Sequence, residues 1–139
     1  RVDRYEPAMN RVQPGDARDS SSPAAFAGTV ARLCAGDALR PASRDRLIAW
    51  MRATTTGQRR LRAGLPAGWR VGDKTGTGFS AGLPDRIHDV AIFWPPRSRP
   101  WVLACFYDGP VQSTGWVRPQ DEAVLAEVGR LAAAFVRGR

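Results

Sequence analysis

The stretch "HDVAIFWPPRSRPWVLACFY", residues 88–107, places two apolar runs on either side of a proline-rich turn. Both runs are rich in β-branched and aromatic residues, which favour strands, and the short turn predicts that the strands pair as an antiparallel hairpin. The first run is apolar almost throughout, as is typical of a strand covered on both faces. We therefore expect this hairpin to form the centre of a sheet with other elements on each side.

The flanking sequence predicts those elements. A third strand is expected at "WRVGDKT", residues 69–75, after a connecting loop "RRLRAGLPAGW" at 59–69. Upstream, Ser22 can cap a helix that starts at Pro23 and ends near Gly36, and a second helix runs from Pro41 towards Gly57. This order predicts an α+β fold, an antiparallel sheet packed by helices.

A closing helix is expected after Pro119, with acidic residues first and arginines last, an order that suits the helix dipole. Its apolar residues recur at helical spacing, so we expect this stripe to pack on the sheet. The stripe consists of Val124, Leu125, Val128, Leu131, Ala132, Phe135 and Val136.

Bulk composition limits the classes of function. The 139 residues suffice for one domain, and the net charge is +8. Lys74 is the only lysine, and the arginines are scattered rather than clustered, so we do not expect nucleic acid as a partner. The longest apolar run, at 101–107, is too short to span a membrane. Cys34, Cys105 and His88 lack metal-ligand spacing, so no metal or zinc hydrolase is expected; free thiols are favoured over a disulfide.

Two segments carry groups suited to chemistry. In "GDKTGTG", residues 72–78, Lys74 stands among threonines and glycines, which suggests an anion held against bare backbone; a solvated lysine at a strand end is the alternative. In "RYEPAMN", residues 4–10, Glu6 and Asn10 could hold one water between them, as a general base for hydrolysis requires; a loop glutamate exposed to solvent is the alternative. A bridge from Arg4 to Asp19 would close the segment into a compact loop.

These motifs, together with "PGDARDSSSP", "WMRATTTG" and "RAGLPAGW", resemble class A serine β-lactamases in their order and spacing. The resemblance runs from residue 1 to the terminal helix. It implies a β-lactamase/transpeptidase-like fold that is incomplete in this chain, in which 1–139 form the C-terminal part of the domain. Residues 1–22 would be the omega loop, 23–57 the helical part, and 69–139 the strands and terminal helix.

The resemblance also implies roles at the omega loop. Glu6 matches the base that activates the deacylating water, and Asn10 matches the amide that shares this water. The base of the acylation step is disputed in the family between this glutamate and a lysine. Arg4 and Asp19 match the structural bridge of the loop, and Glu6–Pro7 matches a peptide bond that is often cis.

On the strand, Lys74 and Thr75 match residues that line the cleft and receive the substrate carboxylate, and Gly76 would let the ligand lie against the backbone. Thr77 matches the residue whose backbone N–H supplies half of an oxyanion hole. One further arginine binds the carboxylate in many members. We prefer Arg60 for this role, with Arg86 as the alternative.

Two parts of the family's machinery are missing from the sequence. It contains neither the nucleophile motif Ser-x-x-Lys nor Ser-Asp-Asn. The chain is therefore expected to be half of an enzyme. The resemblance implies that the complete enzyme is exported, periplasmic or secreted, acts on β-lactam antibiotics, needs no cofactor and is a monomer. The isolated chain is expected to be inactive and to expose apolar faces. A penicillin-binding D,D-peptidase-like fragment, and a non-catalytic remnant or basic binding module, stay open as alternatives.

Overall fold

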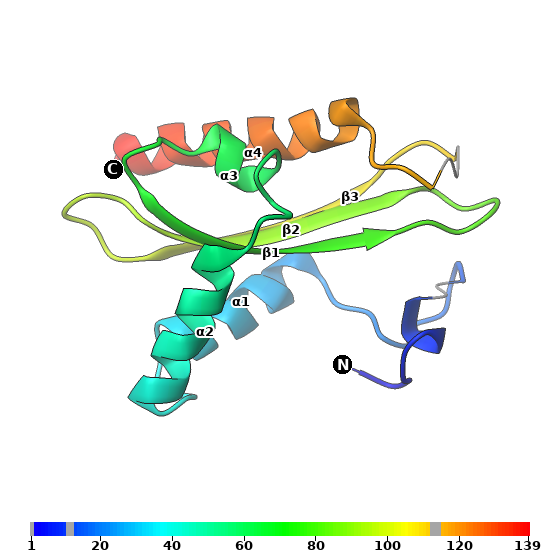
Figure 1. Ribbon diagram of the computed structural model, residues 1–139, viewed down its shortest axis with the longest axis horizontal. Helices are drawn as coiled ribbons and strands as arrows, with labels where there is room; N and C mark the ends of the chain where they lie inside the picture. Colours follow the sequence, from blue (N-terminus) through cyan, green and yellow to red (C-terminus); the bar gives the residue numbers. More distant parts are fainter. Residues whose placement is uncertain (1, 11–12, 112–114) are drawn as a thin grey trace.

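The computed structural model describes residues 2–10, 13–111 and 115–139 and contains a three-stranded antiparallel sheet in the order β1-β2-β3. The strands are β1 (Arg70–Gly78), β2 (Arg86–Trp94) and β3 (Trp101–Asp108). Helices α1 (Pro23–Cys34) and α2 (Pro41–Ala53) cover one face of the sheet, and α3 (Leu61–Gly64) and α4 (Pro119–Arg137) cover the other (Figure 1). The predicted α+β architecture is confirmed.

The central strand β2 has its residues buried from Asp89 to Phe93, because helices pack on both of its faces. Residues on the α3 and α4 side form one apolar cluster around Leu61, Ile87 and Leu125. Residues on the opposite side form a second cluster around Met51 and Ile92. The sheet is therefore the middle layer of three, as the apolar run at 88–94 predicted.

Strand β1 lies at an edge of the sheet and extends further than predicted, through Gly78. Lys74 is opposite Val90 in the register, and Thr77 is opposite Ile87. The whole Lys74–Thr77 segment is therefore held straight by pairing to β2, while its other edge carries no neighbouring strand in the described structure.

Helix α1 begins as the sequence predicted. The Ser22 hydroxyl oxygen accepts a hydrogen bond of 3.2 Å from the Ala25 N–H, and Pro23 occupies the first turn. Helix α2 ends at Ala53, before Gly57, because the backbone becomes extended at Thr54. The segment 59–69 was predicted as a loop throughout; this is wrong for Leu61–Gly64, which form the single turn of α3.

The apolar stripe predicted for α4 is only partly buried. Leu125 is fully buried, whereas Val124, Leu131 and Phe135 are 40%, 53% and 53% exposed. Leu125, Val128 and Val136 of the stripe pack into the core, whereas Gly129 and Ala133 face inwards in place of Leu131 and Phe135. The helix meets α3 at Gly129, where an added Cβ would lie 2.2 Å from the Leu61 carbonyl oxygen. The close contact between α3 and α4 at this point therefore requires glycine.

Candidate active site

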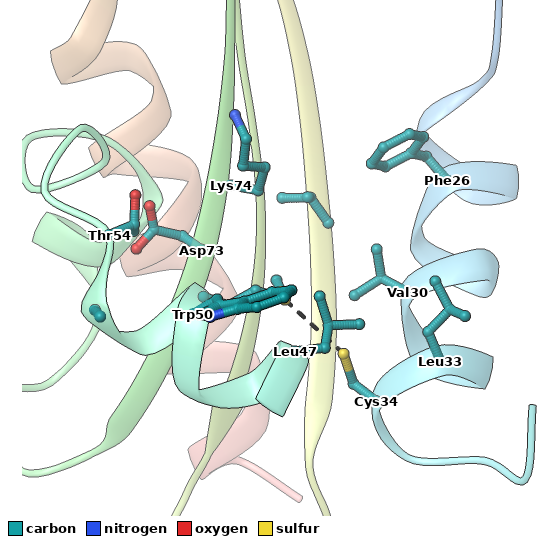
Figure 2. Close-up of a pocket in the computed structure, with 12 residues that line it drawn as sticks. Phe26, Val30, Leu33, Cys34, Leu47, Trp50, Thr54, Asp73 and Lys74 are labelled. Atoms are coloured by element: carbon teal, nitrogen blue, oxygen red, sulfur yellow. Dashed lines mark hydrogen bonds between the residues drawn. The ribbon is translucent and has the colours of Figure 1, made fainter. Parts of the chain in front are cut away.

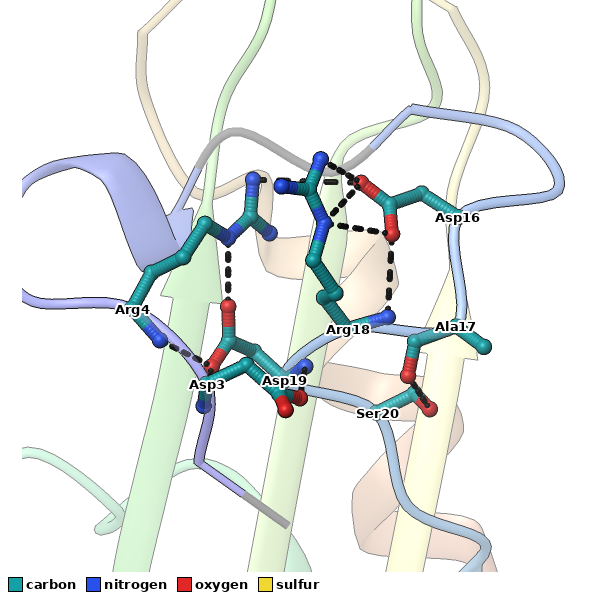
Figure 3. Close-up of polar contacts among 7 residues, drawn as sticks. All are labelled: Asp3, Arg4, Asp16, Ala17, Arg18, Asp19 and Ser20. Carbon is teal, nitrogen blue, oxygen red and sulfur yellow. Dashed lines mark hydrogen bonds and ion pairs between the residues drawn. The ribbon is translucent and has the colours of Figure 1, made fainter.

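Hydrogen bonds and an ion pair between Asp3, Arg4 and Asp19 join the two ends of the N-terminal loop (Figure 3). Arg4 Nε donates to Asp19 Oδ2 at 2.6 Å, and the Arg4 N–H donates to Asp19 Oδ1 at 3.1 Å. The Asp19 N–H in turn donates to Asp3 Oδ2 at 2.9 Å. The Asp3 N–H and the Arg4 side chain hold the pKa of Asp19 below its usual value. The ion pair that the sequence predicted is therefore present, with backbone bonds around it.

A second ion pair lies inside this loop. Arg18 Nη2 donates to Asp16 Oδ2 at 2.6 Å, and the Arg18 N–H donates to Asp16 Oδ1 at 3.0 Å. These contacts hold the pKa of Asp16 well below its usual range. This pair was not predicted, although an Asp and an Arg two residues apart in a turn are its signal in the sequence.

Glu6 and Asn10 come together on the short 3-10 helix η1 (Ala8–Asn10) and the turn before it. Asn10 Nδ2 donates to Glu6 Oε2 at 2.6 Å, and both side chains are exposed. The Glu6–Pro7 peptide bond is cis. The carboxylate thus has one oxygen fixed by an amide and a second oxygen directed away from that bond.

The edge of β1 presents Lys74, with Thr75 and Gly76 partly exposed. Lys74 Nζ donates to the Thr75 carbonyl at 2.6 Å, and the Thr75 and Thr56 hydroxyl oxygens are 2.9 Å apart. An added Cβ on Gly76 would lie 3.4 Å from the Cβ of His88 on the neighbouring strand. Because Gly76 has no side chain, the backbone of the strand is accessible at this position.

Arg60 lies beneath this strand rather than free in solvent, and it is only 3% exposed. Its guanidinium donates to the carbonyls of Gly76 at 3.1 Å and His88 at 2.8 Å, and to Thr77 Oγ1 at 2.8 Å. Arg86 is instead near Asp108, with Nε 3.9 Å from Oδ1. Of the two arginines considered, Arg60 is the one bonded to the Thr77 side chain.

Two buried carboxylates behind the strand were missed in the sequence. Asp73 Oδ1 accepts from Arg62 Nε at 2.7 Å, and Asp89 Oδ2 accepts from the Leu61 N–H at 3.2 Å. Burial, together with the nearby charge of Asp73, raises the pKa of Asp89 to about 7. Burial also raises the pKa of Asp73, against the lowering effect of Arg62. In the sequence, both could have been found as aspartates that lie within predicted strands, Asp73 at 69–75 and Asp89 at 88–94.

An apolar groove of about 430 Å³ opens beside Lys74, between α1, α2 and β1 (Figure 2). Its walls include Phe26 and Val30 from α1 and Trp50 from α2, whose indole is 66% exposed. Cys34 also lines it, and both Cys34 and Cys105 are free thiols. The exposure of large apolar side chains here agrees with the expectation for an incomplete domain.

Glu6 and Lys74 make their described side-chain hydrogen bonds within their own segments, to Asn10 and Thr75 respectively. The described residues include no group of three or more His, Cys, Asp or Glu side chains that could hold a metal ion. In the same residues, no helix is long and apolar enough to cross a membrane.

Comparison with known proteins places this geometry in a family. The model of the beta-lactamase enzyme family matches residues 1–136. The chain belongs to this family. It is 41% identical over 132 residues to the carbapenem-hydrolyzing beta-lactamase KPC of Klebsiella oxytoca, covering 95% of this chain and 43% of that protein. It is 42% identical over 136 residues to a beta-lactamase of Mycobacterium tuberculosis, covering 98% and 42%.

Solved structures agree. An ancestral class A beta-lactamase superposes with a TM-score of 0.82 at 48% identity, covering 96% of this chain and 48% of that chain. The putative class A beta-lactamase PenP of Rhodopseudomonas palustris gives a TM-score of 0.84 at 44% identity, covering 96% and 48%. The family member described here thus spans about half the length of its relatives, and it corresponds to the C-terminal portion of a class A β-lactamase.

Proposed function

We propose that this β-lactamase chain supplies the omega loop and the substrate-binding strand of a class A serine enzyme that opens the β-lactam ring of penicillins and cephalosporins. The hydrogen bond of 2.6 Å between Asn10 and Glu6 supports this proposal most directly. The amide fixes the Glu6 carboxylate and leaves an oxygen free to take a proton from water. That water would then attack the acyl-enzyme, with Glu6 as general base.

The edge of β1 is proposed to bind the substrate. Lys74 and the Thr75 hydroxyl would receive the substrate carboxylate, and the low surface at Gly76 would let the ligand lie along the strand. The Thr77 N–H would donate to the oxygen that becomes negative as the lactam carbonyl turns tetrahedral. Arg60, bonded to Thr77 Oγ1 at 2.8 Å, would orient that hydroxyl, while Glu122 Oε1, 3.4 Å from Arg60 Nε, offsets its positive charge.

The nucleophile must come from a second segment. Serine attack requires the Ser-x-x-Lys motif that this sequence lacks, and the second wall of the cleft requires Ser-Asp-Asn. The apolar groove beside Lys74 is the surface where such a segment would pack. We propose that the chain alone does not hydrolyse β-lactams, and that the complete enzyme is an exported monomer without metal or cofactor.

A complementation assay tests the proposal. The chain would be produced together with the N-terminal half of a class A relative that carries Ser-x-x-Lys and Ser-Asp-Asn, and turnover of a chromogenic cephalosporin would be followed. We expect hydrolysis by the pair and none by either half. Glu6→Ala should let an acyl-enzyme form and persist in mass spectra, whereas Glu127→Ala, on the exposed face of α4, should leave deacylation unchanged.

Three outcomes would contradict the proposal. Steady turnover by the purified chain would show that it does not need a second segment. Rapid deacylation by the Glu6→Ala pair would show that Glu6 is not the base, even if the pair is active. A folded pair that forms no acyl-enzyme at all would favour a non-catalytic remnant.

A further inference from the structure

A second cleft, of about 590 Å³, lies at the opposite end of the sheet from Thr77. It is formed where the turn before β1, the β2–β3 turn and the end of α4 meet. The register places Arg70 and Trp94 at this end, and Gly78 and Arg86 at the other. The cleft is therefore separate from the proposed β-lactam site.

The lining of this cleft combines two indoles with positive charge. Trp69 and Trp101 contribute the aromatic surface, and Arg97, Arg137 and Arg139 contribute the charge; no acidic side chain lines it. All three arginines are exposed, and in the described part of the chain none of them forms an ion pair with an acidic residue. The described acidic side chains therefore do not neutralise the charge of these three arginines.

The aromatic side chains are held in fixed positions. Trp69 stacks on Phe93 with ring centroids 5.6 Å apart, and the Arg137 guanidinium lies 5.9 Å from the Trp69 ring. Trp101 Nε1 donates to Ser98 Oγ at 3.3 Å. A ligand would therefore meet an aromatic surface that is already ordered, which lowers this part of the cost of binding.

Arg97 has an unusual backbone conformation. The Ser98 N–H donates to the Pro95 carbonyl at 3.3 Å, so Arg97 is the third residue of a four-residue turn, and its φ is +59°. Glycine or asparagine is the usual residue at that position of such a turn, because a Cβ is crowded there. An arginine in a conformation that favours glycine is strained, and such strain clusters at functional sites. The side chain of Arg97 is therefore a candidate for ligand binding in the cleft.

Helix stabilisation accounts for only part of this charge. Arginines near the end of a helix interact favourably with its dipole, which explains the place of Arg137 on α4. It does not explain Arg97, which comes from the hairpin and converges on the same cleft. Guanidinium groups bind carboxylates through paired hydrogen bonds and also stack on aromatic rings.

We propose that this cleft binds a small planar aromatic carboxylate, with its ring against the indoles of Trp69 and Trp101 and its carboxylate between Arg97 and Arg137. The volume falls within the range of small-molecule sites. The site does not depend on the β-lactamase chemistry proposed above.

Titration calorimetry with 2-naphthoate tests this site. It would use the 139-residue chain and, in parallel, the two-chain complex of the complementation assay. The neutral 2-naphthamide and the non-aromatic cyclohexanecarboxylate are the matched ligands. We expect both to bind at least about tenfold more weakly than 2-naphthoate, and added salt to weaken 2-naphthoate.

Variants separate a binding role from a structural one. Arg97→Gly should weaken 2-naphthoate about tenfold while raising the melting temperature, because glycine fits the turn; Arg137→Gln should weaken binding similarly. Arg99→Gln, on the same hairpin but outside the lining, should bind like the parent chain. Equal binding of the amide and the acid, an Arg99→Gln effect as large as that of Arg97→Gly, or loss of binding in Lys74→Ala alone would overturn the proposal.

Discussion

Arg62 donates from Nε to Oδ1 of Asp73 at 2.7 Å, and Asp73 is the residue directly before Lys74. The Asp73 side chain is fully buried, and Gly57 leaves room for it, since an added Cβ there would lie 1.8 Å from Oδ2. The ion pair thus connects β1, the strand that carries Lys74, to α3. This ion pair links the stability of the fold to the position of the proposed binding strand.

Replacing Arg62 by glutamine should therefore be strongly destabilising. The change leaves the Asp73 carboxylate buried without its charged partner, and breaking a buried pair in this way costs about 3–5 kcal/mol. Urea unfolding would measure the free energy. Arg130→Gln, which breaks the exposed pair with Glu127, is the control and should cost less than about 1 kcal/mol. Equal effects of the two changes would show that the buried Arg62–Asp73 pair contributes no more to the free energy of unfolding than an exposed ion pair does.

The stability of the chain should depend on the ionisation of Asp89. Burial raises the pKa of this group from 3.8 to about 7, so the folded chain holds the proton more tightly than the unfolded chain does. Stability from this group is therefore fully present below pH 4 and declines as the pH rises towards 7, by a few kcal/mol in total.

The variant Asp89→Asn isolates that effect. Its amide oxygen can still accept from the Leu61 N–H, but it does not ionise. Asp19 and Asp121 have lowered pKa values, so the stability that they contribute is lost as the pH falls. This loss is the same in the parent and the variant, and it cancels in the difference between them. The difference in unfolding free energy between the variant and the parent should accordingly grow between pH 4 and pH 7. A difference that does not change with pH would contradict the raised pKa.

Gly129 should be intolerant of even one added methyl group. Its Cβ would lie 2.2 Å from the Leu61 carbonyl oxygen, so Gly129→Ala must push α4 away from α3, at a cost of about 3 kcal/mol. Gly28→Ala, within α1 and with open space around its Cβ, is the matched control and should stabilise by roughly 0.5–1 kcal/mol. Thermal unfolding followed by circular dichroism distinguishes the two; a neutral Gly129→Ala would show that the helices are not in close contact.

The same contact explains where sequence reasoning succeeded and failed. Period and turn residues predicted three strands and the start of α1, because these features depend on local sequence. The buried face of α4 depends on α3, a single turn too short to show a period. The predicted stripe therefore included Leu125, Val128 and Val136, which pack into the core, but also Leu131 and Phe135, which are exposed. Hydrogen-bond partners could not be predicted for the same reason, because Asp89 accepts from the N–H of Leu61, which is 28 positions away in the sequence.

Motif residues were easier to predict than the residues that support them. The Arg4–Asp19 and Glu6–Asn10 contacts are present, since short loops bring such pairs together. The resemblance suggested Arg60 as a ligand of the substrate carboxylate, which stays a prediction. It did not predict the burial of Arg60 under Gly76 and His88, which requires the register of β1 on β2. Long-range packing, rather than the motif, determines that geometry.

Arg60 and Arg86 should therefore differ in their effect on substrate binding. In the two-chain complex, Arg60→Gln would remove the hydrogen bonds to Thr77 Oγ1 and to the Gly76 and His88 carbonyls that hold the binding strand, so we expect KM for a cephalosporin to rise about tenfold. Arg86→Gln is the matched control, because its guanidinium is near Asp108 at the end of the sheet, and it should change KM less than about twofold. Steady-state kinetics with penicillin and cephalosporin substrates would measure both, with urea unfolding as a check on folding. A larger rise in KM for Arg86→Gln than for Arg60→Gln would assign the carboxylate to Arg86 and reduce Arg60 to a support of the strand.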